Sequence, residues 1–242
     1  MHCFYCEKIN LPGSAVELDE RDWKHLFKTL RAVPGEKIML MDGRGITADA
    51  VVAEDRGIIV EHCEQTTEPE VKLHLYLVVP KKQKMDQLLK QCAEIGVWSI
   101  TPMTSARSVA LASGENASDR WESLLLEGCK QSHNPFIPLV GEVTKFGDAV
   151  KSVAVQPVTP FFGAPDAPVT DAAIAKSGSE IAWFVGPEGG FTPEEEKLML
   201  EHGFNKLSIG NWIMRVETAA VCGAAILLFE KQKARGIRGS NQ

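Results

Sequence analysis

Residues 181–229 read IAWFVGPEGGFTPEEEKLMLEHGFNKLSIGNWIMRVETAAVCGAAILLF, and this stretch decides the fold. Its first five residues are aliphatic and aromatic and stop at a Gly-Pro pair, which predicts a short buried strand. Three of the five residues from Gly186 to Gly190 are glycines. Because glycine tolerates positive φ and has no side chain, this loop can bring its backbone close to a ligand.

A helix is expected directly after this glycine loop. Thr192 suits the N-cap position and Pro193 the first helical position, while Glu195 completes a capping box. The helix is expected to end at Gly203.

The same order of elements then recurs. A second strand is expected over residues 206–209, with a turn at Gly210-Asn211 and a helix over residues 219–229. Strand, glycine loop and helix, used twice, is the layout of an open α/β sheet that binds a ligand at the carboxyl ends of its strands. Two ordinary βα turns without a ligand would have the same pattern. The last helix is apolar on nearly every face, so it needs cover from a core or from a partner chain.

The composition is typical of a globular protein that does not enter a membrane. The chain has 242 residues, of which 44% are hydrophobic and 24% are charged. It contains no apolar run of the roughly 20 residues that span a bilayer, and its N-terminus lacks the features of a signal peptide. We therefore expect a cytoplasmic protein whose six cysteines are reduced. The formal net charge of −6 excludes nucleic-acid binding by bulk electrostatics, so any RNA contact must come from local patches.

Two domains are expected, residues 1–70 and residues 71–242, because the polar segment 65–70 separates a β-rich part from an α/β part. The first contains short strands and a hairpin turn at residues 42–45. Its one helix is expected to begin after an Asp19 N-cap. The core-facing side of that helix has helical spacing and consists of Trp23, Leu26, Phe27 and Leu30.

Basic side chains gather at three places and are the candidate RNA contacts, because clustered cations bind phosphates. Four lie along the first helix, three follow the first strand of the second domain, and one lies in a later loop. Solvated surface charge is the alternative explanation. These residues are Arg21, Lys24, Lys28, Arg31, Lys81, Lys82, Lys84 and Arg107.

Several other kinds of chemistry are excluded. Cys3 and Cys6 have the spacing of zinc ligands, but residues three apart on a strand point to opposite faces, and the chain has no second such pair. The sequence has no phosphate-binding G-x-x-x-x-G-K-[ST] motif and no nucleophile elbow. No metal is expected.

The motif pair GPEGGFTPEEE (186–196) and IGNWIMRVETAA (209–220) resembles the C-terminal signature of the RsmE-type 16S ribosomal RNA (uracil-N3)-methyltransferases, which belong to the SPOUT superfamily. Residues 80–109 and 25–45 resemble further parts of the same family, so the resemblance covers most of the chain. It implies a trefoil-knotted C-terminal α/β domain preceded by a small PUA-like β-barrel domain. It also implies a homodimer in which the partner chain completes each site.

The resemblance further implies that S-adenosyl-L-methionine is the cofactor. Backbone groups of the two glycine loops would read the adenine, and the start of the last helix would close the pocket. The implied cofactor-binding residues are Val185, Gly186, Pro187, Glu188, Gly189, Gly190, Ile209, Gly210, Asn211, Ile213, Met214, Thr218 and Ala219.

Arg215 and Glu217 are the candidate catalytic residues. Arg215 cannot be a general base because its guanidinium stays protonated. It could orient a uracil and stabilise negative charge on the uracil carbonyl oxygens as the ring NH is lost, or it could form an ion pair with Glu217 or Glu188. Glu217 is a candidate base, although it could instead hold Arg215 or the backbone in place. The reaction is an in-line displacement that depends mainly on positioning.

The expected activity is methylation of N3 of one uridine in 16S ribosomal RNA, within the small ribosomal subunit. The alternative is a ribosome-binding or assembly factor that keeps the fold with little or no methyl transfer. Asn134 and Trp212 favour this alternative, because the family usually has arginine at these two positions.

Overall fold

The computed structural model describes residues 1–108, 117–167 and 171–236. The chain forms two compact units. Unit 1 consists of Met1–Glu68 and Leu125–Ile137, and unit 2 consists of Pro69–Leu124 and Pro138–Gln242. The expected division follows residue 70, and the first boundary between the two units follows Glu68. Residues 125–137, which the sequence placed in the second domain, pack with the first.

Long-range backbone hydrogen bonds explain why residues 125–137 belong to unit 1. Gly45 N donates to Pro135 O at 3.0 Å, and Ile137 N donates to Gly43 O at 3.0 Å. The ammonium of Lys130 also lies 2.8 Å from the buried carboxylate of Asp22. These contacts join segments about 90 to 110 residues apart, which no local sequence pattern reveals.

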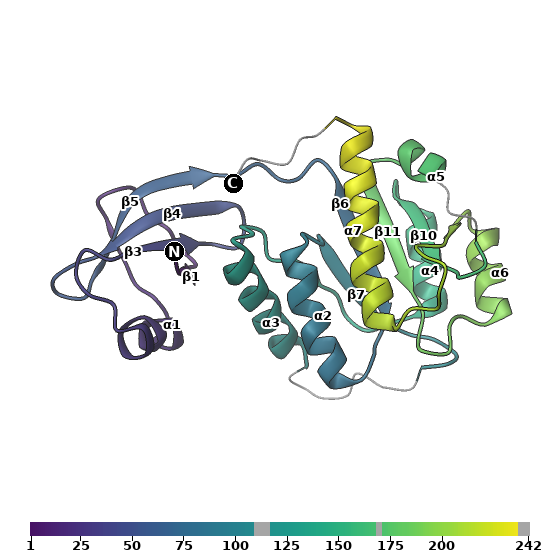
Figure 1. Cartoon of the computed structure of the whole chain (residues 1–242), viewed down its shortest axis with the longest axis horizontal. Coiled ribbons are helices and arrows are strands. Elements are labelled where there is room, and N and C mark those ends of the chain that lie inside the picture. Colours follow the sequence, from purple (N-terminus) through teal and green to yellow (C-terminus); the bar gives the residue numbers. More distant parts are fainter. Residues whose placement is uncertain (109–116, 168–170, 237–242) are drawn as a thin grey trace. The chain divides into compact units, whose positions relative to one another are not determined.

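Unit 1 is built on a five-stranded sheet with the order β1-β3-β4-β5-β2 (Figure 1). The strands β3, β4 and β5 form an antiparallel meander, and β1 pairs in parallel with β3. Ile38 and Leu40 of β3 share one hydrophobic core with Leu26 of the helical segment, and all three are fully buried. The strands are β1 (Cys3–Tyr5), β2 (Ala15–Val16), β3 (Lys37–Met41), β4 (Ile46–Val52) and β5 (Ile58–Gln65).

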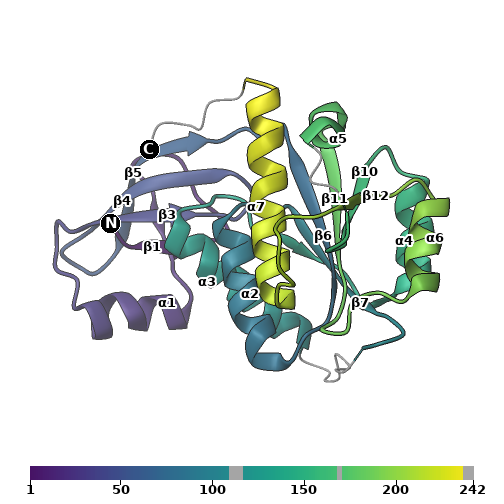
Figure 2. The same ribbon diagram turned by 45° about the vertical axis from the view of Figure 1, so that its right-hand side comes forward.

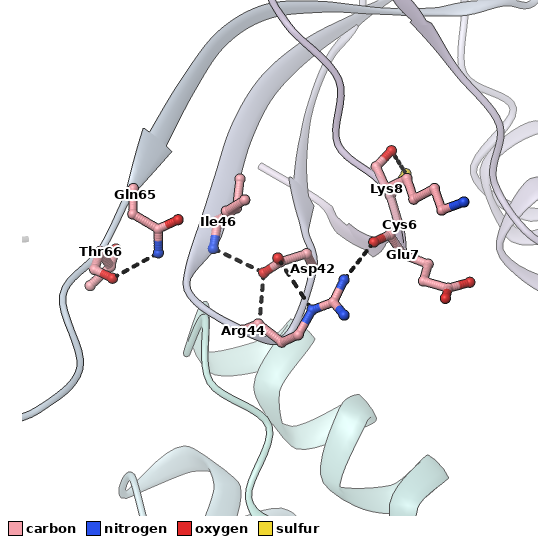
Figure 3. A network of polar contacts seen from close by, with 8 residues as sticks. All are labelled: Cys6, Glu7, Lys8, Asp42, Arg44, Ile46, Gln65 and Thr66. Atoms are coloured by element: carbon pink, nitrogen blue, oxygen red, sulfur yellow. Dashed lines mark hydrogen bonds and ion pairs between the residues drawn. The ribbon is translucent and has the colours of Figure 1, made fainter.

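The hairpin turn predicted at residues 42–45 is confirmed (Figure 3). The carboxylate of Asp42 accepts hydrogen bonds from the backbone N–H of Arg44 at 2.8 Å and of Ile46 at 2.9 Å. The guanidinium of Arg44 donates to the carbonyl of Glu7 at 2.9 Å and so fixes the turn to the segment after β1. Gly45 has a φ of 109° and leaves no room for a Cβ atom beside Phe136, so this position requires glycine.

The helical segment of unit 1 begins as predicted, because Asp19 caps it by accepting a hydrogen bond from Asp22 N at 2.6 Å. The α-helical turn α1 (Glu20–Lys24) continues into a π-helical segment, η1 (His25–Leu30). Leu26 is fully buried, Phe27 and Leu30 are partly buried against the core, and Trp23 packs on Phe27. The four basic residues of this segment, Arg21, Lys24, Lys28 and Arg31, are exposed.

Unit 2 is built on a seven-stranded sheet in which every pairing is parallel. The strand order is β12-β10-β11-β6-β7-β8, and β9 also pairs with β7. This confirms the parallel α/β sheet predicted for the second domain. The strands are β6 (Lys72–Val78), β7 (Ser99–Thr104), β8 (Leu139–Val140), β9 (Thr144–Lys145), β10 (Thr159–Gly163), β11 (Glu180–Val185) and β12 (Asn205–Leu207).

Helices cover both faces of this sheet (Figures 1 and 2). On one face α7 packs against β6 and β11 and lies between α2 and α5, while α4 and α6 cover the other face. Burial from both sides explains why β11 is apolar at nearly every position. The helices are α2 (Lys82–Glu94), α3 (Ala117–Ser132), α4 (Phe146–Ala154), α5 (Asp171–Lys176), α6 (Pro193–Glu201) and α7 (Val216–Ala234). No helix in the described ranges is long and apolar enough to span a bilayer.

The helix α7 approaches the sheet closely at Gly223. A Cβ atom on Gly223 would lie 2.5 Å from the ring of Trp183, which is fully buried in β11. The indole N–H of Trp183 donates to the carbonyl of Ala219 at 3.2 Å, one turn earlier in the helix. The missing side chain of Gly223 therefore makes room for the largest buried ring of the core.

Candidate functional site

A pocket lies at the carboxyl ends of three neighbouring strands, β10, β11 and β12. The loops after these strands and the start of α7 enclose about 680 Å³ of empty space, including the open mouth. Its lining residues are Gly163, Ala164, Pro165, Trp183, Val185, Gly186, Pro187, Glu188, Gly190, Phe191, Leu207, Ser208, Ile209, Gly210, Trp212, Ile213, Met214, Val216 and Ala219.

Most of the residues expected to bind the cofactor come together in this pocket. Ten line it: Val185, Gly186, Pro187, Glu188, Gly190, Ile209, Gly210, Ile213, Met214 and Ala219. Gly189, Asn211 and Thr218 are next to lining residues in the chain but do not line the pocket themselves.

The segment after β10 forms a third wall of the pocket, which was not predicted from the sequence. Gly163, Ala164 and Pro165 follow β10, which lies between β11 and β12 in the sheet. The strand β12 also ends at Leu207 rather than at residue 209 as predicted, so Ser208 and Ile209 belong to the loop and line the pocket. The signal available in the sequence was the Gly-Ala-Pro break after an apolar strand, because strand ends of a parallel sheet meet at one edge.

The first glycine loop has the shape that its glycines predict. Gly190 has a φ of 67° and its N–H donates to Pro187 O at 2.9 Å, which closes a turn. A Cβ atom on Gly186 would lie 3.2 Å from the backbone nitrogen of Phe191. The capping box of α6 is confirmed, since Glu195 N donates to Thr192 Oγ1 at 3.2 Å and Thr192 N donates to Glu195 Oε2 at 2.9 Å.

The second glycine loop places two large apolar side chains in solvent at the pocket. Trp212 is 84% exposed and Ile213 is 85% exposed, although both line the pocket. They are the two most exposed large apolar side chains of the described part of the chain apart from Val155. The loop itself is held by the hydroxyl of Ser208, which donates to Gly210 O at 2.9 Å.

The lining of the pocket suits a ligand that carries a flat ring with polar groups at its edge and a positive charge. Its walls are mostly apolar side chains and loop backbone, which can pair with the edge of a ring. Glu188 contributes the one ionisable side chain, and no Lys, Arg or His of the described part of the chain lines the pocket. Among the lining residues, a positively charged sulfonium would therefore meet one carboxylate, which is paired with Lys84 outside the lining at 3.6 Å, and no cation.

Arg215 is the N-cap residue of α7 and lies between the lining residues Met214 and Val216. Its side chain is exposed and, among the residues that the structure describes, pairs with neither Glu217 nor Glu188. The ion pair considered as an alternative role for Arg215 is therefore not formed. A guanidinium without a partner is available to a substrate.

Glu217 is paired with Lys84 instead. The ammonium of Lys84 lies 3.3 Å from Oε2 of Glu217, a buried oxygen, in an ion pair without hydrogen-bond geometry. Burial opposes ionisation of Glu217, but its backbone N–H, Lys84 and the charge of Arg215 together hold the pKa of this carboxyl below its usual value. Because a carboxylate with a lowered pKa accepts protons weakly, Glu217 is poorly suited to act as a base.

The cations predicted to contact RNA fall into two groups. Lys81 and Lys82 are exposed at the start of α2, as are Arg21, Lys24, Lys28 and Arg31 in unit 1. Lys84 and Arg107 instead contact the first glycine loop: Lys84 lies 3.6 Å from Glu188, and Arg107 donates to Gly189 O at 2.6 Å.

Comparison with known proteins identifies the family. Residues 67–228 match the sequence model of the RNA methyltransferase domain family. The chain belongs to this family. The resemblance of the two motifs at residues 186–220 is thereby confirmed.

Relatives match nearly the whole chain. The ribosomal RNA small subunit methyltransferase E of Aquifex aeolicus is 29% identical over 94% of this chain and 99% of its own length. The protein of the same name from Synechocystis is 26% identical over 88% of this chain and 72% of its own. The crystal structure of the Neisseria gonorrhoeae methyltransferase E, bound to S-adenosyl methionine, superimposes with a TM-score of 0.85 at 28% identity, covering 95% of this chain and 97% of that one.

Proposed function

We propose that the protein transfers a methyl group from S-adenosyl-L-methionine to N3 of one uridine in the 16S ribosomal RNA of the small ribosomal subunit. The observation that carries this proposal is the pocket at the ends of β10, β11 and β12, which is lined by both motifs of the family signature and contains no cation in the described ranges. The relatives are named as small-subunit ribosomal RNA methyltransferases, which supports 16S ribosomal RNA as the substrate.

The lining residues fit the cofactor. The apolar side chains of Leu207, Ile209 and Met214 would enclose the adenine, and the backbone of residues 186–190 would pair with polar groups of the ligand. The carboxylate of Glu188 would favour the positive charge of the sulfonium. When bound, the cofactor supplies an electrophilic methyl group.

The chain itself would supply positioning and charge stabilisation. Arg215, exposed beside the pocket, would hold the uracil and stabilise the negative charge that grows on its carbonyl oxygens when the N3 proton leaves. Glu217 would act as an anchor rather than as the base, because Lys84 keeps it ionised. The in-line arrangement of donor and nucleophile would account for most of the rate enhancement.

We also propose that the active form is a homodimer. An apolar side of α7 is open to solvent in the single chain: Ile226 is 37% exposed and Phe229 is 62% exposed. Cys222, one helical turn before Ile226, is exposed as well. A second copy would cover these side chains and, at the pocket, the exposed Trp212 and Ile213. The prediction that α7 needs cover on every face supports this interface.

The finer features of the expected fold are proposals as well. A trefoil knot in unit 2 is supported by the strand order, because the chain leaves β12 at the sheet edge and must cross the end of β10 to reach α7 over β11. The helix α5, which connects β10 to β11, packs against α7 on that same face. Unit 1, with its five-stranded sheet and four exposed basic residues on its helical segment, would be the PUA-like RNA-binding domain.

A ribosomal RNA substrate would place the protein in the cytoplasm with the ribosome. The second candidate function is a ribosome-binding or assembly factor with little or no methyl transfer. Trp212 favours it, because an exposed tryptophan stands at the pocket where the family usually has arginine.

The deciding experiment is a methyl-transfer assay with labelled S-adenosyl-L-methionine and small subunits that lack the modification, followed by digestion of the RNA and mass spectrometry. A single 3-methyluridine is the expected product. Cofactor binding by calorimetry without any transfer would indicate a different RNA substrate. Absence of cofactor binding would refute the methyltransferase.

A further inference from the structure

Lys84 occupies an electrostatically unfavourable place. It lies in the first turn of α2 together with Lys81 and Lys82, and this turn contains no acidic residue. The N-terminus of a helix carries a partial positive charge, so three lysines there oppose the helix dipole. Lys81 and Lys82 are exposed to solvent, whereas the side chain of Lys84 is only 31% exposed and has found two carboxylates.

These two carboxylates come from different elements of the site. Glu188 belongs to the first glycine loop and lines the pocket, and Glu217 belongs to the first turn of α7. The ammonium of Lys84 lies 3.6 Å from Oε1 of Glu188 and 3.3 Å from Oε2 of Glu217. The two oxygens are therefore no more than about 7 Å apart, and without the ammonium between them they would repel each other.

The side chain of Arg107 binds the backbone of the same glycine loop. Its guanidinium donates to Gly189 O at 2.6 Å and, more weakly, to Phe191 O at 3.4 Å. The neighbouring Ala106 N donates to Glu195 Oε1 at 2.9 Å, which ties the loop after β7 to the capping box of α6. The two peptide carbonyls beside Gly190 thus have a charged donor.

We propose that Lys84 and Arg107 are positioning residues of the methyl-transfer site rather than contacts for RNA phosphates. Lys84 fixes the first glycine loop to the start of α7, next to Arg215, and Arg107 fixes the carbonyls on the other part of the loop. This inference rests on the proposed function, because the loop matters for catalysis only if it holds the cofactor.

The lysines and the arginine near the site therefore divide into two groups, one available to RNA and one that holds the protein's own loops. Lys81 and Lys82 are exposed at the start of α2 and form no ion pair with the residues that the structure describes, so they remain free for a polyanion. Lys84 and Arg107 instead use their donors inside the protein. Loss of Lys84 would leave two carboxylates facing each other beside the pocket, and the loop would move to separate them. The cofactor would then bind a loop that is no longer preorganised.

The test compares Lys84→Met with Lys82→Met, a matched change on the same helical turn whose side chain is exposed and, in the described ranges, makes no ion pair. We expect Lys84→Met to raise the Kd for S-adenosyl-L-methionine roughly tenfold, the effect of losing two partly screened ion pairs. The salt dependence of RNA binding should not change. Lys84→Arg, which keeps the charge, should restore most of the affinity.

Lys82→Met is expected to leave cofactor affinity at the wild-type value. If Lys84→Met instead leaves the cofactor Kd unchanged and lowers the salt slope of RNA binding by about one, Lys84 is a phosphate contact and the inference is wrong. Arg107→Met tests the other part of the loop with the same readouts and the same expected result.

Hydrogen exchange separates this inference from the proposed function. Amides of residues 186–191 should exchange faster in Lys84→Met than in Lys82→Met, in the protein without cofactor. If the wild-type protein neither binds S-adenosyl-L-methionine nor transfers methyl groups, the proposed function fails while this loop measurement still tests the contacts. Equal exchange in both variants would refute the positioning role.

Discussion

The substitution Gly223→Ala tests the close packing of α7 on the sheet. A Cβ atom there would lie 2.5 Å from Cε2 and Cζ2 of Trp183 and 2.6 Å from its Nε1, and none of these ring atoms can yield without moving a fully buried tryptophan. Overpacking of this kind costs about 1–3 kcal/mol. Displacement of the ring also weakens the 3.2 Å hydrogen bond to Ala219 O, worth about 1 kcal/mol.

Helix propensity acts in the opposite direction, because alanine is favoured over glycine by about 1 kcal/mol in a helix interior. We therefore expect Gly223→Ala to lower the free energy of unfolding by about 1–3 kcal/mol, the overpacking and hydrogen-bond costs less the propensity gain. Trp183 lines the pocket, so the affinity for S-adenosyl-L-methionine should also fall.

The assay is urea unfolding followed by circular dichroism, at one fixed protein concentration because association would add to the apparent stability. Gly147→Ala is the matched control: Gly147 lies in α4, and a Cβ atom there would meet nothing within 4 Å. This control should raise stability by up to about 1 kcal/mol. If Gly223→Ala proves as stable as Gly147→Ala, the packing argument is refuted.

Three further predictions concern the site, the interface and the buried thiols. Arg215→Ala should lower kcat by about 10²–10³-fold with an unchanged cofactor Kd in calorimetry; unchanged transfer would remove Arg215 from the catalytic residues. Labelling of the exposed thiol of Cys222 should slow as protein concentration rises, because the proposed dimer covers it; a constant rate would argue against that interface. Burial raises the pKa of the Cys3 thiol to about 11 and that of Cys129 to about 12. A thiol whose pKa is higher in the folded than in the unfolded protein stabilises the fold fully below the unfolded value of 9.0, and this stabilisation is lost as the pH rises towards the folded value. The free energy of unfolding should therefore fall from pH 9 towards 11, and it should fall less steeply in Cys129→Ala.

The parts of the fold that short-range chemistry determines could be predicted from the sequence. The capping box of Thr192 and Glu195, the N-cap of Asp19 and the hairpin turn at residues 42–45 each depend on residues within four positions of one another. The two glycine loops were predictable for the same reason, since glycine and proline restrict or release the backbone locally.

The parts that depend on which strands become neighbours could not be predicted. Gly163–Pro165 form a wall of the pocket only because β10 lies between β11 and β12, an order that strand sequences do not encode individually. Residues 125–137 join unit 1 through pairings with residues 43–45, across more than 80 positions. The positive charge of Lys84 was evident from the sequence, but its partners Glu188, in a loop, and Glu217, in α7, are 104 and 133 positions further along the chain.

The arrangement of charge around the pocket reconciles two opposing demands on the site. A sulfonium cofactor disfavours nearby cations, whereas an RNA substrate that loses a proton needs one. Among the described residues, Lys84 and Arg107 contact the first glycine loop, and Arg215 lies between the lining residues Met214 and Val216. The first two are neutralised by carboxylates or occupied by loop carbonyls, and only Arg215, in the described part of the chain, has neither kind of partner. Among these three cations, the free positive charge is thus confined to Arg215, the residue proposed to meet the uracil. This is the reason that its loss is expected to affect kcat and to leave cofactor affinity intact.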